Sequence, residues 1–252
     1  GTSLTINAEA TTGTQGIKAL NNGTGALEIT TTGTTTGTSS NGISAINSTA
    51  GTSLTINAAT TTGGVFGIYA DNEGTGALSI TTSGTTTGTT YAGIYANNSA
   101  AGTSLKITAE DTTGTLGIYA RNRGDGALEI KTTGTTTGTS SNGILAYMSN
   151  TASTGDLTIN AATTMSDIDG IYALNTGTGA LSITTTGTTT GGDDGIQAFI
   201  NNTASTGDLT INAATTTGGV YGIQGYNKGT GALNITTSGA ITGGTGYGIR
   251  TI

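Results

Sequence analysis

The chain has 252 residues, a net charge of −7 and an isoelectric point near 4.2. Only seven residues are Lys or Arg, which argues against binding to the phosphate backbone of nucleic acids. The absence of Cys and His excludes disulfides and thiolate metal sites and removes the commonest general bases, and no apolar stretch is long enough for a membrane-spanning helix.

One motif recurs along the whole chain. The tripeptide Leu-x-Ile first stands at residues 4–6 and returns after 23, 27, 24, 27, 23, 29, 24, 28 and 24 residues. Short and long intervals alternate, so the larger unit is a pair of repeats of about 51 residues. A fixed period in this range is typical of solenoid proteins, which offer long, flat surfaces suited to binding or display.

Each repeat contains three segments with strand character. The first is Leu-x-Ile, with both apolar residues on one face, and the second is a Thr run such as 34–36. The third is Gly-Ile-x-Ala-x-Asn, as in 67–72. Gly-rich bends such as 23–25 separate the segments, and we expect positive φ at these glycines. Three strands in about 25 residues predict an all-β fold: a single domain over residues 1–252, formed by a right-handed, single-stranded parallel β-helix of about ten coils.

Apolar substitutions in the Thr runs indicate which side chains of the second segment face inward. Ile241 and Met165 replace Thr in two coils, and we take both as inward, which also assigns Thr35, Thr86, Thr136 and Thr189 inward. The expected outward row is Thr11, Thr34, Thr61, Thr85, Thr112, Thr135, Thr164, Thr188 and Thr216. A second outward Thr then occurs only in alternate coils, at Thr36, Thr87, Thr137 and Thr190, with Gly13, Gly63, Gly114 or Gly218 near that place in the others. Ice-binding β-solenoids use paired Thr rows, so this incomplete pairing leaves ice binding as a minor alternative.

The third segment predicts an internal ladder and an external stripe. Its last residue is repeatedly Asn, at Asn21, Asn47, Asn72, Asn98, Asn122, Asn175 and Asn227, and we expect these amides to bond from coil to coil. Outward positions hold Tyr69, Tyr95, Tyr119, Leu145 and Tyr172, then Tyr147, Leu174, Phe199 and Tyr226, with Arg121 beside them. This stripe either stabilises the parallel ladder or forms a contact surface. Long loops at 147–156 and 199–208 flank it, which favours the C-terminal half for contact.

The acidic residues do not form a catalytic pair. Glu28 and Glu129 lie four coils apart on one ladder, about 19 Å, too far for paired carboxylates. We expect Lys106 to pair with Glu129 across neighbouring strands. Asp167, Asp169, Asp193 and Asp194 lie in equivalent bends of adjacent coils, where they serve either solubility or a Ca²⁺ ion. We therefore expect a protein without enzymatic activity and without any other cofactor.

Units of the form Gly-Ala-Leu-x-Ile-x-Thr-x-Gly-Thr-Thr-Thr-Gly, at 76–88, 126–138 and 179–191, resemble the repetitive passenger regions of Gram-negative autotransporters. The resemblance implies a right-handed parallel β-helix, export through a C-terminal outer-membrane barrel, and an extracellular location at the bacterial cell surface. Residue 1 falls directly on a repeat, so we expect a fragment whose signal peptide, cap and barrel lie elsewhere.

The functions that follow from the resemblance are all forms of recognition or display. The first is an adhesin and virulence factor that binds a host cell-surface protein or glycan. The second is a released ligand that activates a host receptor, and the third is a structural stalk. Self-association through the stripe also remains open.

Overall fold

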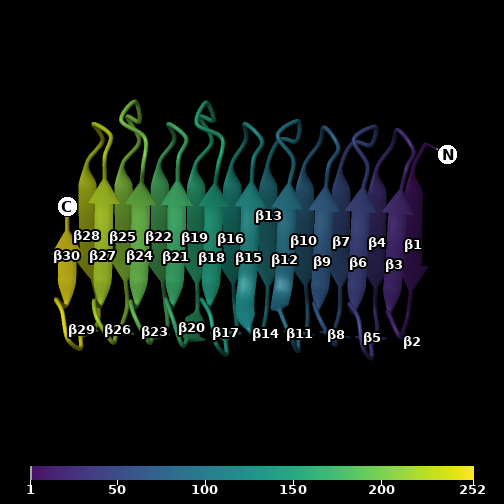
Figure 1. Ribbon diagram of the computed structural model, residues 1–252, viewed down its shortest axis with the longest axis horizontal. Helices are drawn as coiled ribbons and strands as arrows, with labels where there is room; N and C mark the ends of the chain where they lie inside the picture. Colours follow the sequence, from purple (N-terminus) through teal and green to yellow (C-terminus); the bar gives the residue numbers. More distant parts are fainter. Residues whose placement is uncertain (1) are drawn as a thin grey trace.

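The computed structural model describes residues 2–252. All regular secondary structure within them is β-strand, with no helix. The 30 strands form three parallel sheets of ten strands, and each coil adds one strand to each sheet (Figure 1). Coil one holds β1 to β3 and coil ten holds β28 to β30, at opposite ends of a rod. The all-β solenoid with three strands per coil is confirmed, while its right-handed turn stays a prediction.

The first sheet contains β1 (Leu4–Ala8), β4 (Leu27–Thr31), β7 (Leu54–Ala58), β10 (Leu78–Thr82), β13 (Leu105–Ala109), β16 (Leu128–Thr132), β19 (Leu157–Ala161), β22 (Leu181–Thr185), β25 (Leu209–Ala213) and β28 (Leu233–Thr237). The second sheet contains β2 (Thr11–Gly13), β5 (Thr35–Gly37), β8 (Thr61–Gly63), β11 (Thr86–Gly88), β14 (Thr112–Gly114), β17 (Thr135–Gly138), β20 (Thr163–Ser166), β23 (Thr189–Gly191), β26 (Thr216–Gly218) and β29 (Ile241–Gly243). The third sheet contains β3 (Ile17–Asn21), β6 (Ile43–Asn47), β9 (Ile68–Asn72), β12 (Ala92–Asn98), β15 (Leu116–Asn122), β18 (Ile144–Met148), β21 (Ile171–Asn175), β24 (Ile196–Ile200), β27 (Ile223–Asn227) and β30 (Ile249–Thr251).

The described residues include no helix with the length and apolarity needed to cross a membrane.

The core runs along the rod axis as stacks of identical residues. Leu54 pairs in register with Leu78, Ile56 with Ile80, and Ile68 with Ile94, and all six side chains are fully buried. Burying one such side chain stabilises the fold by about 1.5–3 kcal/mol. Because a slip of one residue would turn these side chains outward, the Leu-x-Ile pattern fixes the register of the first sheet.

The repeated glycines allow neighbouring coils to pack closely against one another. No glycine in residues 2–252 has positive φ, so the expectation of left-handed bends is wrong. A β-carbon on Gly42 would lie 2.6 Å from the Cγ2 methyl of Thr61 and 2.7 Å from the carbonyl oxygen of Gly67. The Gly of each Gly-Ile-x-Ala segment is therefore required because a neighbouring coil occupies the space of a side chain.

The asparagine ladder is confirmed from Asn21 to Asn122, whereas the side-chain amides of Asn175 and Asn227 donate to backbone carbonyl groups and not to another asparagine. Asn47 donates from Nδ2 to Oδ1 of Asn72 at 2.8 Å, Asn72 does the same to Asn98 at 2.8 Å, and Asn98 to Asn122 at 2.9 Å. Most of these amides also donate to carbonyl groups in the adjoining turn, as Asn72 does to Gly76 at 3.0 Å. The ladder thus satisfies buried polar groups and joins neighbouring coils through their side chains.

Two coils replace this Asn by an apolar residue. Met148 and Ile200 are fully buried at the ladder position in the coils that carry the long loops. In the first of these loops, buried Ser153 donates to the carbonyl oxygen of Asp125 at 2.8 Å and accepts from the backbone N–H of Gly155 at 3.1 Å. Each longer loop therefore supplies its own polar contacts in place of the missing amide.

The expected register of the second sheet is wrong in alternate coils. Met165 pairs with Thr137 and Thr190 on the outward face and is 45% exposed, whereas Thr164 is fully buried. Ile241, by contrast, does lie on the inward face, in register with buried Thr216. The residues expected outward that instead lie on the inward face are Thr11, Thr61, Thr112, Thr164 and Thr216. Gly13, Gly63, Gly114 and Gly218 lie on that inward face as well.

Candidate functional site

A continuous row of aromatic rings lies on the outward face of the third sheet. Tyr69, Tyr95 and Tyr119 pair in register on β9, β12 and β15. Their rings are parallel, with centroids 5.1 Å apart between Tyr69 and Tyr95 and 4.7 Å apart between Tyr95 and Tyr119. Strand spacing in a parallel sheet is about 4.8 Å, so the backbone itself sets this stacking distance.

Beyond Tyr119 the rings alternate between two outward positions of the strand. Tyr147 lies 6.0 Å from Tyr119, Tyr172 lies 5.8 Å from Tyr147, and Phe199 lies 5.7 Å from Tyr172, all between tilted rings. Leu145 and Leu174 occupy the outward positions that the rings leave, in register with Tyr119 and Tyr147 respectively. Tyr226 lies on the next strand, β27, in register with Phe199 on β24. The structure therefore brings the residues predicted from the sequence together on one face.

Two aromatic residues of the same cluster were missed. Phe66 lies in the bend before β9, and its ring is 5.3 Å from Tyr69, 4.9 Å from Tyr91 and 5.6 Å from Tyr95. Tyr91 is 48% exposed. Both residues stand just before a third-sheet strand, and this position was the available signal. We call the set from Phe66 to Tyr226 the aromatic stripe: Phe66, Tyr69, Tyr91, Tyr95, Tyr119, Leu145, Tyr147, Tyr172, Leu174, Phe199 and Tyr226.

The phenol groups of the stripe hold their protons strongly. Burial raises the pKa of Tyr95 to about 12, and its neighbours Tyr119, Tyr69 and Asp71 add to the effect. Burial is also the main reason why the pKa values of Tyr69, Tyr147 and Tyr172 are raised. These hydroxyl groups are therefore neutral near pH 7 and can donate hydrogen bonds to a partner.

Arg121 is the charged residue that the sequence placed beside the stripe. It pairs in register with Tyr147, and its Nε donates to Oγ of Ser149 at 3.1 Å. Ser149 belongs to the loop that follows β18. The guanidinium group is thus held between the stripe and the base of this loop.

The two long loops lie on the same side of the rod, and Figure 1 shows both projecting beyond the other turns. Asn202 donates from Nδ2 to the carbonyl oxygen of Thr151 at 3.1 Å and to that of Thr176 at 2.8 Å. The first bond joins loops that belong to coils six and eight. The loops at 147–156 and 199–208 therefore form one bridged rim at the end of the third sheet.

The four aspartates do not fit a calcium site. Asp169 and Asp194 are buried and stacked, and Oδ1 of Asp169 accepts from the backbone N–H of Asp194 at 3.2 Å. Oδ2 of Asp169 accepts from Nδ2 of Asn142 at 2.9 Å. Asp167 and Asp193 are instead exposed. Within residues 2–252, no three Asp, Glu, His or Cys side chains are grouped so that they could hold a metal ion.

The buried carboxylate of Asp169 is nevertheless perturbed. Its pKa is raised to about 6, mainly by burial and in part by the nearby charges of Asp194 and Asp193. Hydrogen bonds from the Asp194 backbone and from Asn142 act in the opposite direction. The stack is explained by these internal bonds and needs no ligand.

The first sheet carries the predicted ion pair. Lys106 Nζ lies 3.0 Å from Glu129 Oε2, and both side chains are partly exposed to solvent, so the pair adds little stability. Glu28 lies on β4, four strands away from Glu129 on β16 in the order of the sheet. The structure therefore does not bring these carboxylates together.

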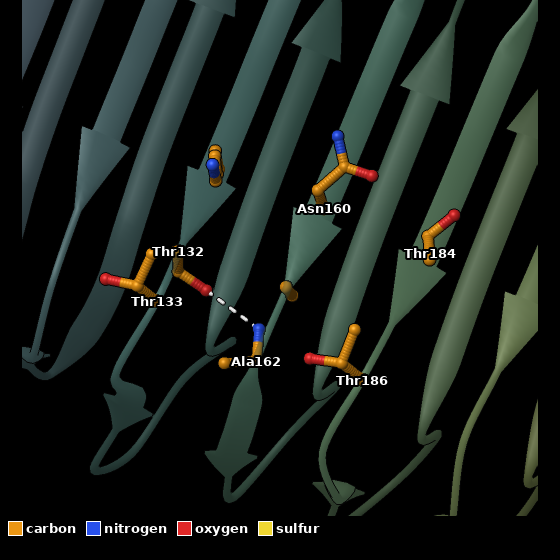
Figure 2. A pocket seen from close by; sticks show the side chains of 8 residues that line it. Thr132, Thr133, Asn160, Ala162, Thr184 and Thr186 are labelled. Carbon is orange, nitrogen blue, oxygen red and sulfur yellow. Dashed lines mark hydrogen bonds between the residues drawn. The ribbon is translucent and has the colours of Figure 1, made fainter.

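The surface hollows are shallow. The one in Figure 2 has a volume of about 300 Å³ and lies where the first sheet turns into the second. Its lining consists of Lys131, Thr132, Thr133, Asn160, Ala161, Ala162, Thr184 and Thr186. Thr132 Oγ1 accepts from the backbone N–H of Ala162 at 3.2 Å. Without a carboxylate, this lining offers no acid–base pair for glycoside hydrolysis.

No family model, no curated protein and no solved structure matches this chain.

Proposed function

We propose that this chain is part of a bacterial surface protein of the autotransporter passenger type and that it binds a host cell-surface protein through the aromatic stripe. The observation that carries the proposal is the continuous ring row from Phe66 to Phe199, which ends beside a rim of two bridged loops. Tyrosine is enriched at protein interfaces, and contiguous apolar area at a surface marks interaction sites. Tyr91 is exposed and the other residues of the stripe are half-buried, so their outer edges form such an area. Loops held by a rigid scaffold are also a common place for recognition.

The ring geometry favours a protein partner over a glycan. Tyr69 and Tyr119 stack on the two faces of Tyr95, so neither face of that ring is free to stack on a sugar. What the central rings offer outward is their edges and neutral hydroxyl groups. These features suit apolar and hydrogen-bonding contacts with a polypeptide.

The proposed role needs no chemistry at the rod surface. The chain lacks His and Cys, and the hollow of Figure 2 is lined without a carboxylate. Export to the bacterial surface remains part of the proposal, supported by the repeat pattern and by the absence of Cys.

The test is binding of the purified chain to cultured host cells, measured by flow cytometry over a concentration series. A variant with Tyr95, Tyr119, Tyr147 and Tyr172 changed to Ser should lose saturable binding. The matched control changes Thr55, Ser79, Thr158 and Ser182, outward on the first sheet, to Ala and should bind normally. Circular dichroism establishes that both variants keep their strand content.

Treatment of the cells separates the two kinds of partner. Binding that disappears after protease treatment but survives glycosidases supports a protein receptor, and the reverse contradicts it. Phosphorylation of receptor tyrosine kinases in the same cells would identify the chain as an activating ligand rather than an adhesin. If the unmodified chain does not bind, the recognition role is wrong and the stalk is the better account.

A further inference from the structure

The corrected register of the second sheet places two rows of threonine on its outward face. The first row is Ala10, Thr34, Thr60, Thr85, Asp111, Thr135, Thr163, Thr188, Thr215 and Ala240. The second row is Thr12, Thr36, Thr62, Thr87, Thr113, Thr137, Met165, Thr190, Thr217 and Thr242. We call these two rows the threonine lattice. Six coils carry Thr in both rows, and no coil lacks Thr altogether.

The lattice is regular in two directions. Neighbouring residues of one row lie about 4.8 Å apart, and the two rows lie about 6.6 Å apart, twice the rise per residue of a strand. The second-sheet strands pair in parallel and in register from coil to coil, and Figure 1 shows the strands of the first and third sheets of the same coils running side by side with little change of direction. Stacked inward residues such as Thr61 and Thr86 hold this face from below. β-branched side chains are stiff at χ1, which keeps each hydroxyl and methyl group in place.

The hydroxyl groups of the lattice are not used inside the protein. Within residues 2–252, none of the lattice threonines makes a side-chain hydrogen bond, although Thr38, Thr89 and Thr139, just past the lattice, each donate to a carbonyl of the preceding coil. The lattice residues are all at least partly exposed. Their hydroxyl groups are therefore left to water.

The chemistry of the face indicates what it binds. Asp111 is its one charged residue, and no lattice residue is aromatic. A crystalline polysaccharide would be bound by rings that stack on sugars, and a charged partner by charged side chains, and the lattice supplies neither. A rigid two-dimensional array of hydroxyl and methyl groups instead matches ordered water, because the oxygen atoms on prism faces of ice repeat at similar spacings.

We propose that the threonine lattice binds ice. This site lies on the second sheet and is independent of the aromatic stripe on the third. Asp111 and Met165 are the interior interruptions: they separate the full coils two to four from coil six, and coil six from coils eight and nine. Replacing them by Thr would join coils two to nine into one unbroken array.

The first test is partition into a slowly growing ice hemisphere, together with thermal hysteresis of the purified chain. The unmodified chain should be enriched in ice relative to an inert globular protein. A variant with Thr62→Lys and Thr190→Lys should lose this enrichment, because the long charged side chains stand above the lattice plane. The matched control carries Thr55→Lys and Thr158→Lys on the first sheet, where Lys106 already occupies the same row. This control variant should be enriched in ice as strongly as the unmodified chain.

The second test is a gain of function. The variant Asp111→Thr with Met165→Thr should show greater thermal hysteresis than the unmodified chain at equal concentration. No enrichment in ice, equal losses in both lysine variants, or no gain on repair would each overturn the proposal. Retention on microcrystalline cellulose that the Thr62→Lys, Thr190→Lys variant abolishes, without ice activity, would assign the face to a polysaccharide instead.

Discussion

The Cγ2 methyl group of Thr112 lies 2.5 Å from the place where a β-carbon on Gly93 would stand. The same relationship joins a third-sheet glycine to an inward second-sheet residue in coil after coil, as Gly143 to Thr164 at 2.4 Å. Inward threonines and inter-sheet glycines therefore fit together as pairs. Each pair fixes how closely the second and third sheets meet.

This fit predicts a coupled loss of stability. Gly93→Ala should destabilise the rod by roughly 2–4 kcal/mol, since the added methyl overlaps a packed neighbour. Thr112→Ser removes that neighbour's methyl group and should recover part of the loss in the double variant. Urea unfolding of the two single variants and the double variant measures the coupling. Strictly additive losses would show that the two residues do not interact in this way.

The inward threonines predict a stabilising substitution. Among residues 2–252, the buried Oγ1 atoms of Thr61, Thr86, Thr112, Thr136, Thr164 and Thr189 have no hydrogen-bond partner. Thr136→Val replaces such a hydroxyl by a methyl group of similar size, and it should raise the free energy of unfolding by about 1 kcal/mol. Ile241 already shows that an apolar residue fits this inward row. The control is Thr137→Val on the outward face, for which the urea midpoint should not change.

An Asn→Ala substitution should lower the free energy of unfolding more at the centre of the asparagine ladder than near the end of the rod. Asn98→Ala removes the acceptor of Asn72 and the donor to Asn122, leaving buried amide groups unpaired. It should lower the free energy of unfolding by about 2–3 kcal/mol. Asn227 has no asparagine partner: it donates to backbone carbonyls and accepts from the backbone N–H of Gly229 near the end of the rod, so Asn227→Ala should cost clearly less. Equal losses, measured by thermal and urea unfolding, would contradict a cooperative ladder.

The pKa of Asp169 predicts higher stability in weak acid. Its folded pKa is raised to about 6 from the ordinary value of 3.8, so the folded chain holds this proton more tightly than the unfolded chain does. The resulting stabilisation is fully present below pH 3.8 and is lost as pH rises through about 6. The free energy of unfolding should therefore be about 1–2 kcal/mol higher at pH 5 than at pH 7.5, and the urea midpoint should rise with it. Asp169→Asn should reduce this pH dependence, and an unchanged pH profile in that variant would assign the effect elsewhere.

Apolar alternation made the first and third sheets predictable. In Leu54–Ala58, for example, two large aliphatic residues separated by one polar residue can face the core in only one way. The repeated Asn at the end of Gly-Ile-x-Ala-x-Asn likewise had one simple explanation, an internal ladder, and the structure contains it. The aromatic stripe followed from the same register, because the residue between Ile and Ala must point outward.

The second sheet could not be placed in the same way. Three consecutive threonines show no alternation of polarity, so one misleading residue was enough to shift the register. Met165 was that residue: it is apolar yet lies on the outward face at 45% exposure. The role of the glycines was hidden for a different reason. Sequence shows that a side chain is absent, but only packing shows that the Thr61 methyl group occupies the space beside Gly42.

The alternation of short and long coils bears on how such a gene can change. Each strand pairs only with its counterparts in the adjoining coils, and the faces and the aliphatic core recur from coil to coil. A recombination event that duplicates or deletes one pair of coils would restore every register at the junction. Successive generations could therefore inherit rods of different reach with the same cross-section. Reach is the property of this molecule that a single genetic step can alter without disturbing its packing.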